Sequence, residues 1–292
     1  MGPNEGRLVH TIAASLGSEE IKAAKKEIVN HGQSLLRLCV VVKLFFNSLP
    51  GAGNRLAQKN ALCKDTGAPI TPFPMQAADL LGLIDEKHLL KHPFYQAWTE
   101  GTLPIEVMRK YAEQYYHLER NFPNFLSAML MTCDDEGIRA KILENFRDET
   151  SGSMNHRELW LQFGEAIGVT REDMKNSEML PETAEAIATF SRICSSNYLQ
   201  GAGALAAYES QIPAIAAKKM EGLEKNYGVS EGIEFFRVHG VMDVHHAQVW
   251  WDMLKGHEEE VAASVKAGRD ALWNFLNGVL KAYKPEMLEM SC

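Results

Sequence analysis

The chain has 292 residues, and 46% of them are hydrophobic, so it could bury the core of one large domain or of two small ones. Its formal net charge is −8 at pH 7. This acidic balance argues against nucleic acid as a main partner, because a phosphate backbone demands a basic protein face.

Hydropathy predicts no membrane-spanning helix, and the cysteine spacing indicates a protein of a reducing compartment. The most apolar run extends from Leu35 to Phe46 and is interrupted by Arg37 and Lys43, whereas a membrane-spanning helix needs about 20 apolar residues. No pair of the five cysteines has C-x-x-C or disulfide-like spacing. We therefore expect reduced thiols, no membrane partner and a cytoplasmic location.

The composition changes near residue 75. Residues 1–74 carry nine Lys or Arg and five Asp or Glu, a net charge of +4, whereas residues 75–292 carry 21 and 33, a net charge of −12. A helix is expected at 18–48, and the stretch from there to residue 74 is rich in Gly and Pro, as is typical of a linker. We expect 1–74 to be a poorly ordered extension and linker, and 75–292 to be the functional domain.

From residue 75 onward the pattern predicts one helix after another. Apolar residues recur three and four positions apart, Gly or Pro marks the breaks, and no stretch alternates with period two. The fold class that we expect is all-α, a helical bundle. The expected helices span 76–91, 93–100, 104–132, 135–150, 155–168, 180–196, 199–226, 230–255 and 257–283.

Three potential metal ligands share one face of the helix expected at 230–255. His239, Asp243 and His246 are offset by four and seven residues, so their side chains leave the helix within about 40° of one another. Two imidazoles and a carboxylate suit iron, manganese or zinc better than calcium or magnesium. The alternative is that each histidine is an ordinary hydrogen-bonded helix residue.

Three further candidates lie earlier in the chain. Glu149 and His156 are seven residues apart across an expected helix break. Glu209 precedes Pro213 by four residues, and because proline has no N–H, the helix should kink there. Three histidines and three carboxylates would suit two divalent ions better than one, although no spacing rule ties these three residues to the helical triplet.

A family resemblance joins the six candidates. Six signatures, in order along residues 75–283, resemble the CADD family (chlamydial protein associating with death domains), which belongs to the heme-oxygenase-like, TenA/PqqC-like helical proteins. They are His92-Pro-Phe-Tyr95, Tyr111-Ala-Glu-Gln-Tyr-Tyr-His117, Phe122-Pro-Asn-Phe-Leu-Ser127, Asp148-Glu149 with Asn155-His156, Tyr208-Glu-Ser-Gln-Ile-Pro213, and His239 to Ala247.

The resemblance implies a metal centre and its chemistry. The family's ligands fall on Glu149, His156, Glu209, His239, Asp243 and His246, without a departure at any of them. The implied cofactors are two iron ions, or one manganese and one iron, with O2 as co-substrate and an external reductant.

The resemblance also implies a product. Family members are thought to form 4-aminobenzoate, for folate metabolism, from one of their own tyrosines with nitrogen from a lysine. By motif these residues are Tyr95 and Lys219, and we expect the tyrosine to lie within the pocket of the ligand-bearing segments. Without the resemblance, Tyr95 would be read as a core aromatic and Lys219 as a solvated helix residue, with Lys218 as a competitor.

Two other functions stay open. One is a di-iron oxidase of the same fold that acts on an external small molecule. The other is a non-enzymatic protein-interaction module, although an interaction surface has no use for a buried set of metal ligands. The sequence leaves the oligomeric state open, with a homodimer as one option.

A chain that starts at Met75 is expected to fold and to keep its full metal content. The reason is that the composition changes at the linker, and every candidate functional residue lies beyond it. Circular dichroism and elemental analysis would measure both properties against the full chain. Insolubility or loss of metal in the shorter chain would show that residues 1–74 belong to the core.

Overall fold

The computed structural model describes residues 75–153 and 155–289. The expected helix at 18–48 and the linker that follows it lie outside the described residues, so the domain boundary near residue 75 stays a prediction. The helices are α4 (Ala77–Glu86), the 3-10 turn η1 (Leu89–Lys91), α5 (Pro93–Glu100), α6 (Ile105–Met131), α7 (Glu136–Thr150), α8 (His156–Ala166), α9 (Arg171–Asn176), α10 (Pro181–Ser196), α11 (Tyr198–Glu209), α12 (Ile212–Tyr227), α13 (Glu234–Leu254), α14 (Glu258–Tyr283) and α15 (Glu286–Glu289).

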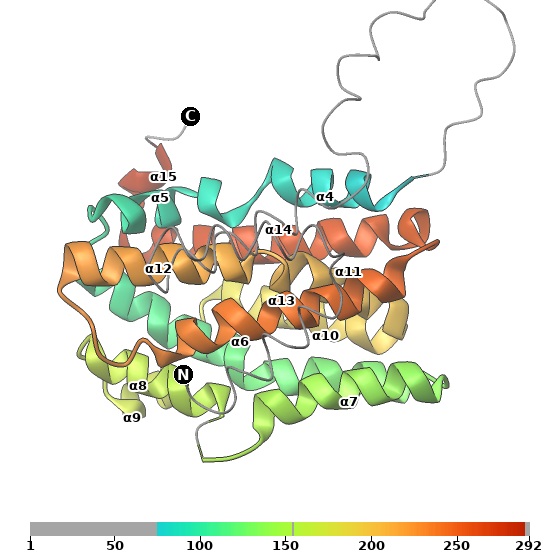
Figure 1. Cartoon of the computed structure of the whole chain (residues 1–292). Coiled ribbons are helices and arrows are strands. Elements are labelled where there is room, and N and C mark those ends of the chain that lie inside the picture. Colours follow the sequence, from blue (N-terminus) through green and yellow to red (C-terminus); the bar gives the residue numbers. More distant parts are fainter. Residues whose placement is uncertain (1–74, 154, 290–292) are drawn as a thin grey trace, which may run out of the picture. The chain divides into compact units, whose positions relative to one another are not determined.

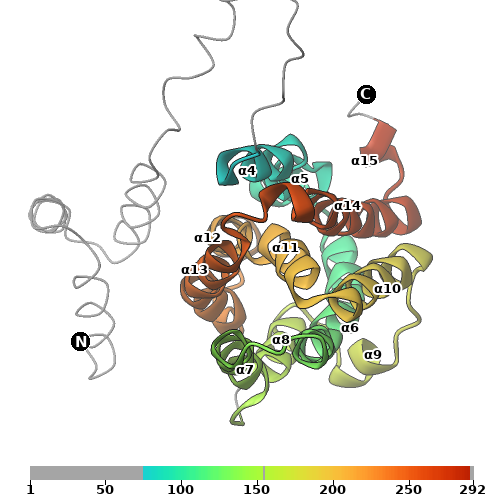
Figure 2. The same cartoon turned by 90° about the vertical axis from the view of Figure 1, so that its right-hand side faces the viewer.

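The described part of the chain is an all-α bundle, as the sequence predicted, and contains no strand (Figure 1). Viewed along the helices, α11 lies in the middle, with α10, α13 and α14 around it (Figure 2). Every residue of α11 from Leu199 to Glu209 is buried except Gln200. Within residues 75–153 and 155–289, no helix combines the length and the apolar character that crossing a membrane requires.

Small residues let α14 approach α11 closely. The middle of α11 consists largely of glycine and alanine, and Gly268 of α14 lies against it. A Cβ atom at Gly268 would lie 2.7 Å from the carbonyl oxygen of Ala204 and 3.0 Å from its Cα atom. Because both atoms belong to the backbone, a larger residue at 268 would force the two helices apart.

Local capping brings α7 and α8 into position for the site. Asp135 caps the start of α7 by accepting a hydrogen bond from the Ile138 N–H at 2.8 Å. Asn155 caps α8 in the same way, accepting from the Glu158 N–H at 3.1 Å. Since α7 ends at Thr150 and α8 begins at His156, the short connection carries Glu149 and His156 to the same side of the bundle.

The start of α5 is fixed by the His92-Pro93 pair. Nδ1 of His92 accepts a hydrogen bond from the Phe94 N–H at 3.1 Å, and Nε2 lies 3.0 Å from Oδ1 of Asn277. Pro93 occupies the first helical position, where its missing N–H costs nothing. This cap turns Tyr95 inward, where its side chain is buried.

Two expected helices are interrupted in the structure. The predicted helix 76–91 ends at Glu86, because His88 starts a separate 3-10 turn by accepting a hydrogen bond from the Leu90 N–H at 3.2 Å. The predicted helix 199–226 is two helices, α11 and α12, with the break directly before Pro213, where a kink was expected. The sequence did not predict α9 and α15, because helices of six and four residues are too short to show an apolar repeat.

The close contact between α11 and α14 predicts that Gly268→Ala lowers the free energy of unfolding by ~1–3 kcal/mol, since the new methyl group would overlap the backbone at Ala204. Gly82→Ala in α4 is the matched control. Its Cβ would meet nothing within 4 Å, so alanine should stabilise the helix by ~0.5–1 kcal/mol. Thermal or urea unfolding of both variants would measure the difference, and equal stabilities would contradict this account of the contact.

Candidate metal centre

Four buried side chains from four different helices converge inside the bundle. They are Glu119 of α6, Glu149 of α7, His156 of α8 and His239 of α13, and one potential ligand atom of each lies within 4.8 Å of those of the other three. The sequence predicted three of these residues as ligands. It missed Glu119, because a lone carboxylate on a tyrosine-rich helix has no spacing that sets it apart.

The two histidines of this cluster are oriented by their hydrogen bonds. Nδ1 of His156 donates to Oε2 of Glu149 at 2.7 Å. Nδ1 of His239 lies 2.8 Å from the carbonyl oxygen of Phe235, to which it donates, and this leaves Nε2 of His239 as the nitrogen with a lone pair. The two imidazole rings lie next to each other, with centroids 4.2 Å apart.

The other three predicted ligands lie in the same region. Glu209 of α11 and Asp243 of α13 line one cavity together with Glu119, Glu149 and His239. The structure therefore brings the carboxylates of four helices to a single cavity. These carboxylates lie far apart in the sequence, so spacing alone does not show that they meet.

His246, the last of the six predicted ligands, lies next to Asp243. Its Nδ1 lies 3.5 Å from Oδ1 of Asp243, and its Nε2 donates to Oδ2 of Asp148 at 3.1 Å. Nδ1 is buried and has no hydrogen-bond partner within the described residues. Asp148 thus fixes the ring so that Nδ1 faces Asp243.

Unpaired buried atoms show that these residues fit a metal. Oε1 of Glu119 and Nδ1 of His246 are both buried without a hydrogen bond among the described residues, and each such atom costs about 1–3 kcal/mol. When Glu119 is ionised and His246 is neutral, each of these atoms offers a lone pair that a cation would accept. A mixed set of carboxylate oxygens and imidazole nitrogens is the set that iron and manganese accept.

Neighbouring groups hold the carboxylate of Glu209 in place. The indole N–H of Trp250 donates to Oε2 of Glu209 at 2.6 Å, and Nδ2 of Asn145 donates to Oε1 at 3.3 Å. Such supporting hydrogen bonds orient metal ligands and tune their basicity. Together with Asp148, these residues were not anticipated as supports from the sequence.

The electrostatics of the cluster favour a cation. Burial raises the pKa values of Glu119 and Glu209, and the charge of Glu149 raises both further. Burial would lower the pKa of a histidine, but the neighbouring carboxylates outweigh it and raise the pKa of His156 to about 9 and that of His246 to about 10. The metal-free cluster therefore retains protons that offset its buried negative charge, and a bound metal ion would replace them.

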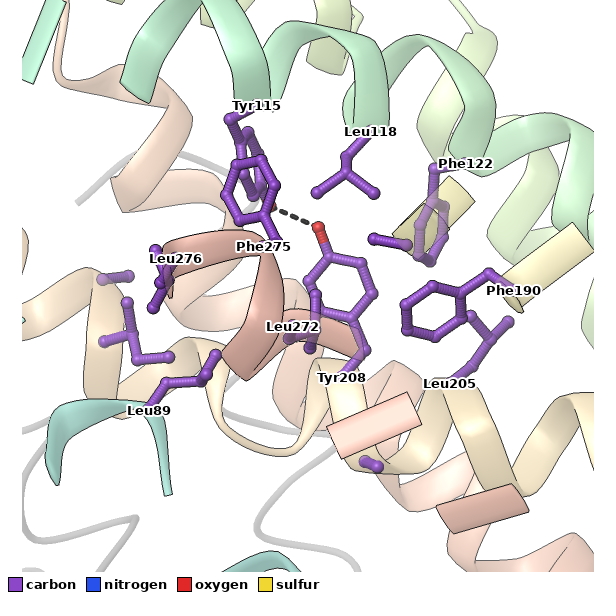
Figure 3. Close-up of a cluster of buried hydrophobic side chains, with 14 of the residues drawn as sticks. Leu89, Tyr115, Leu118, Phe122, Phe190, Leu205, Tyr208, Leu272, Phe275 and Leu276 are labelled. Atoms are coloured by element: carbon purple, nitrogen blue, oxygen red, sulfur yellow. Dashed lines mark hydrogen bonds between the residues drawn. The ribbon is translucent and has the colours of Figure 1, made fainter. Parts of the chain in front are cut away.

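A second cavity adjoins the first and contains Tyr95 and Lys219. Tyr115, Tyr208 and Ile212 line both cavities, so these three side chains form the wall between them. The hydroxyl of Tyr208 donates to the hydroxyl of Tyr115 at 2.7 Å, which ties the two tyrosines of this wall together (Figure 3).

Lys219 is buried in an aromatic cage. Its Nζ donates to the hydroxyl of Tyr111 at 2.6 Å, and no acid pairs with it among the described residues. Burial lowers the pKa of Lys219 well below its usual value, which favours the neutral amine. Nζ lies between 4.7 Å and 5.6 Å from the centroids of the rings of Tyr95, Trp98, Tyr111, Tyr115, Trp160 and Phe236.

The neighbouring lysine, Lys218, lies outside both cavities. Lys218 is exposed and pairs with Glu221 at 2.8 Å on the outer face of α12. The structure thus separates two lysines that the sequence left as competitors.

One expectation about Tyr95 was wrong. The sequence placed its phenol in the pocket of the ligand-bearing segments, but Tyr95 lines the second cavity, where its hydroxyl lies 3.2 Å from that of Tyr111. The phenols that line the cavity of the carboxylates are those of Tyr115 and Tyr208. Tyr95 belongs to α5, which packs against α12, and α12 carries no candidate metal ligand.

Known proteins resemble this chain in sequence and in fold. It is 40% identical over 209 residues to a 4-aminobenzoate synthase of Chlamydia pneumoniae, covering 69% of this chain and 93% of that protein. It is 39% identical over 219 residues to the 4-aminobenzoate synthase of Nitrosomonas europaea, covering 69% and 89%. The crystal structure of a TenA homologue from Pseudomonas syringae is 18% identical, with a TM-score of 0.62 over 75% of this chain and 99% of that one, and shows that the fold is shared.

The family assignment follows from the extent of these matches. A model of the family described as iron-containing redox enzymes matches residues 109–277, a segment that contains Glu119 and all six candidate ligands predicted from the sequence. The match covers more than half of the chain, and the synthases align with most of their own length. The chain therefore belongs to the iron-containing redox enzymes with a heme-oxygenase-like fold, in the CADD family that the 4-aminobenzoate synthases represent.

Proposed function

We propose that this protein is an O2-dependent, non-heme di-iron enzyme that forms 4-aminobenzoate from its own Tyr95, with nitrogen from Lys219. The observation that carries the proposal is the buried amine of Lys219, which lies 5.3 Å from the centre of the Tyr95 ring in a cavity that shares a wall with the carboxylate and histidine cluster. The names of the relatives at about 40% identity supply the product.

The metal ions would be held by the six residues predicted from the sequence: Glu149, His156, Glu209, His239, Asp243 and His246. Their oxygen and nitrogen donors suit an iron pair or one manganese and one iron. When bound, these ions supply the oxidising power of O2, with electrons from an external reductant, for removing a hydrogen atom from a phenol.

The amine of Lys219 is prepared to act as a nucleophile. Attack on a ring carbon needs a free lone pair, so the amine must be unprotonated, and burial favours that state. Its hydrogen bond to the Tyr111 hydroxyl uses one N–H and holds the nitrogen in place. The surrounding rings exclude water, which would otherwise compete as a nucleophile.

Tyr111 connects the two reacting side chains. Its hydroxyl accepts from Lys219 at 2.6 Å and lies 3.2 Å from the hydroxyl of Tyr95. The amine is thereby held over the Tyr95 ring by a group that contacts both partners. Consumption of Tyr95 would make each chain a single-turnover reagent rather than a recycling catalyst.

The metal assignment predicts that His239→Ala and His246→Ala each lose at least one ion per chain while the helical fold survives. Each variant removes one ligand from a shared site, whereas the bundle keeps an extensive apolar core. His245→Ala is the matched control, because His245 neighbours His246 but is exposed. Elemental analysis and circular dichroism measure the two properties, and two metals per chain in both ligand variants would contradict the assignment.

The self-consumption proposal predicts that Tyr95→Phe and Lys219→Arg abolish 4-aminobenzoate formation and leave metal content intact, because neither residue lines the cavity of the carboxylates. Lys218→Arg, in which the exposed neighbour is changed, should form product normally.

Mass spectrometry after incubation with iron, reductant and O2 provides the second measurement. The wild-type chain should lose mass at the peptide that contains Tyr95. Normal product from Tyr95→Phe protein would reject self-consumption and favour an enzyme that acts on an external small molecule.

A further inference from the structure

We propose that Glu119 is a further metal ligand of this centre and supplies its fourth carboxylate. The inference rests on the proposed metal-binding function and adds to it a residue that the six-ligand assignment leaves out. It concerns a side chain of α6, a helix to which that assignment gives no role in holding metal.

The position of Glu119 is that of a ligand. One of its carboxylate oxygens lies within 4.8 Å of potential ligand atoms of Glu149, His156 and His239. The side chain is 4% exposed, and Oε1 has no hydrogen-bond partner among the described residues. No Lys or Arg of that part of the chain forms an ion pair with it, although buried carboxylates are rarely left without a cation.

The register of α6 aims Glu119 at the cavity. Tyr115, four residues before it, and Phe122, three residues after it, line the same cavity, so all three side chains leave one face of the helix. On this face Glu119 meets acids and imidazoles, and no Lys or Arg among the described residues lines the cavity. Glu149, Glu209 and Asp243 line the cavity with it.

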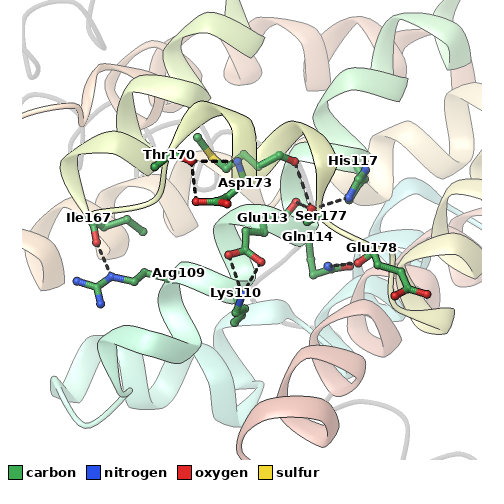
Figure 4. A network of polar contacts seen from close by, with 11 residues as sticks. Arg109, Lys110, Glu113, Gln114, His117, Ile167, Thr170, Asp173, Ser177 and Glu178 are labelled. Carbon is green, nitrogen blue, oxygen red and sulfur yellow. Dashed lines mark hydrogen bonds and ion pairs between the residues drawn. The ribbon is translucent and has the colours of Figure 1, made fainter.

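A second buried glutamate on the same helix behaves differently. Glu113 accepts two hydrogen bonds from Nζ of Lys110, both at 2.9 Å, on the side of α6 that faces α9 (Figure 4). Its charge is compensated within the protein. No Lys or Arg of the described residues pairs with Glu119 in this way, and a metal ion would bring such a positive charge to it.

A fourth carboxylate at Glu119 would balance the charge of two divalent metal ions. Two divalent ions carry four positive charges, and in a buried site an uncompensated charge is costly. Glu149, Glu209 and Asp243 supply three negative charges, and Glu119 supplies the fourth. The protein's own side chains then neutralise both ions without an added anion.

Glu119→Gln tests the inference, because it keeps the size of the side chain and removes its charge and its better donor atom. We would titrate wild-type and variant protein with Fe(II) and with Mn(II) under anaerobic conditions, using chelator competition for affinity and elemental analysis for stoichiometry. The variant should bind at least one ion ~10- to 100-fold more weakly, by analogy with the loss of groups that support ligands. Glu113→Gln is the matched control and should bind both ions as the wild type does.

Glu119→Asp separates a ligand from a distant charge. Aspartate keeps the charge but withdraws the carboxylate by one methylene, so a true ligand position should again weaken one ion. Wild-type affinity in folded Asp protein, or in folded Gln protein, would overturn the ligand role of Glu119. Failure of the wild-type chain itself to bind metal would instead overturn the proposed function.

Discussion

The burial of acids and imidazoles within an apolar bundle is the constraint on which the rest of the structure depends. Carboxylates such as Glu119, Glu149 and Glu209 are each less than 5% exposed, and desolvation makes their charged forms costly. Protons can offset this cost, as the raised pKa values show, and metal ions can offset it further. The site thus exchanges some folding stability for the ability to bind cations.

Helix caps and helix breaks hold these side chains in position within the bundle. Asn155 caps α8 directly before His156, and the break before Pro213 ends α11 at Glu209. Each candidate ligand therefore lies at or near a helix end, or on one face of a long helix, where the backbone fixes its direction. Close contact between α11 and α14 at Gly268 keeps the central helix in place.

The two cavities separate two kinds of side chain. One cavity collects the acids and histidines, and the other encloses the amine of Lys219 among aromatic rings, where it can be neutral. Tyr115 and Tyr208, which form the wall, belong to both. The metal centre and the amine nucleophile that we propose could thereby share one protein interior, although their electrostatic requirements are opposite.

The sequence by itself determined the all-α fold, most helix positions, the break at Pro213 and a set of six side chains that the structure brings to one region. These features follow from periodicity, from backbone chemistry at Gly and Pro, and from motifs. Only the tertiary structure decided that Glu119 joins the cluster, that Tyr95 lines the second cavity, and that Lys219 rather than Lys218 is enclosed. These relations depend on which helices pack together, and local sequence does not encode the distance between residues on separate helices.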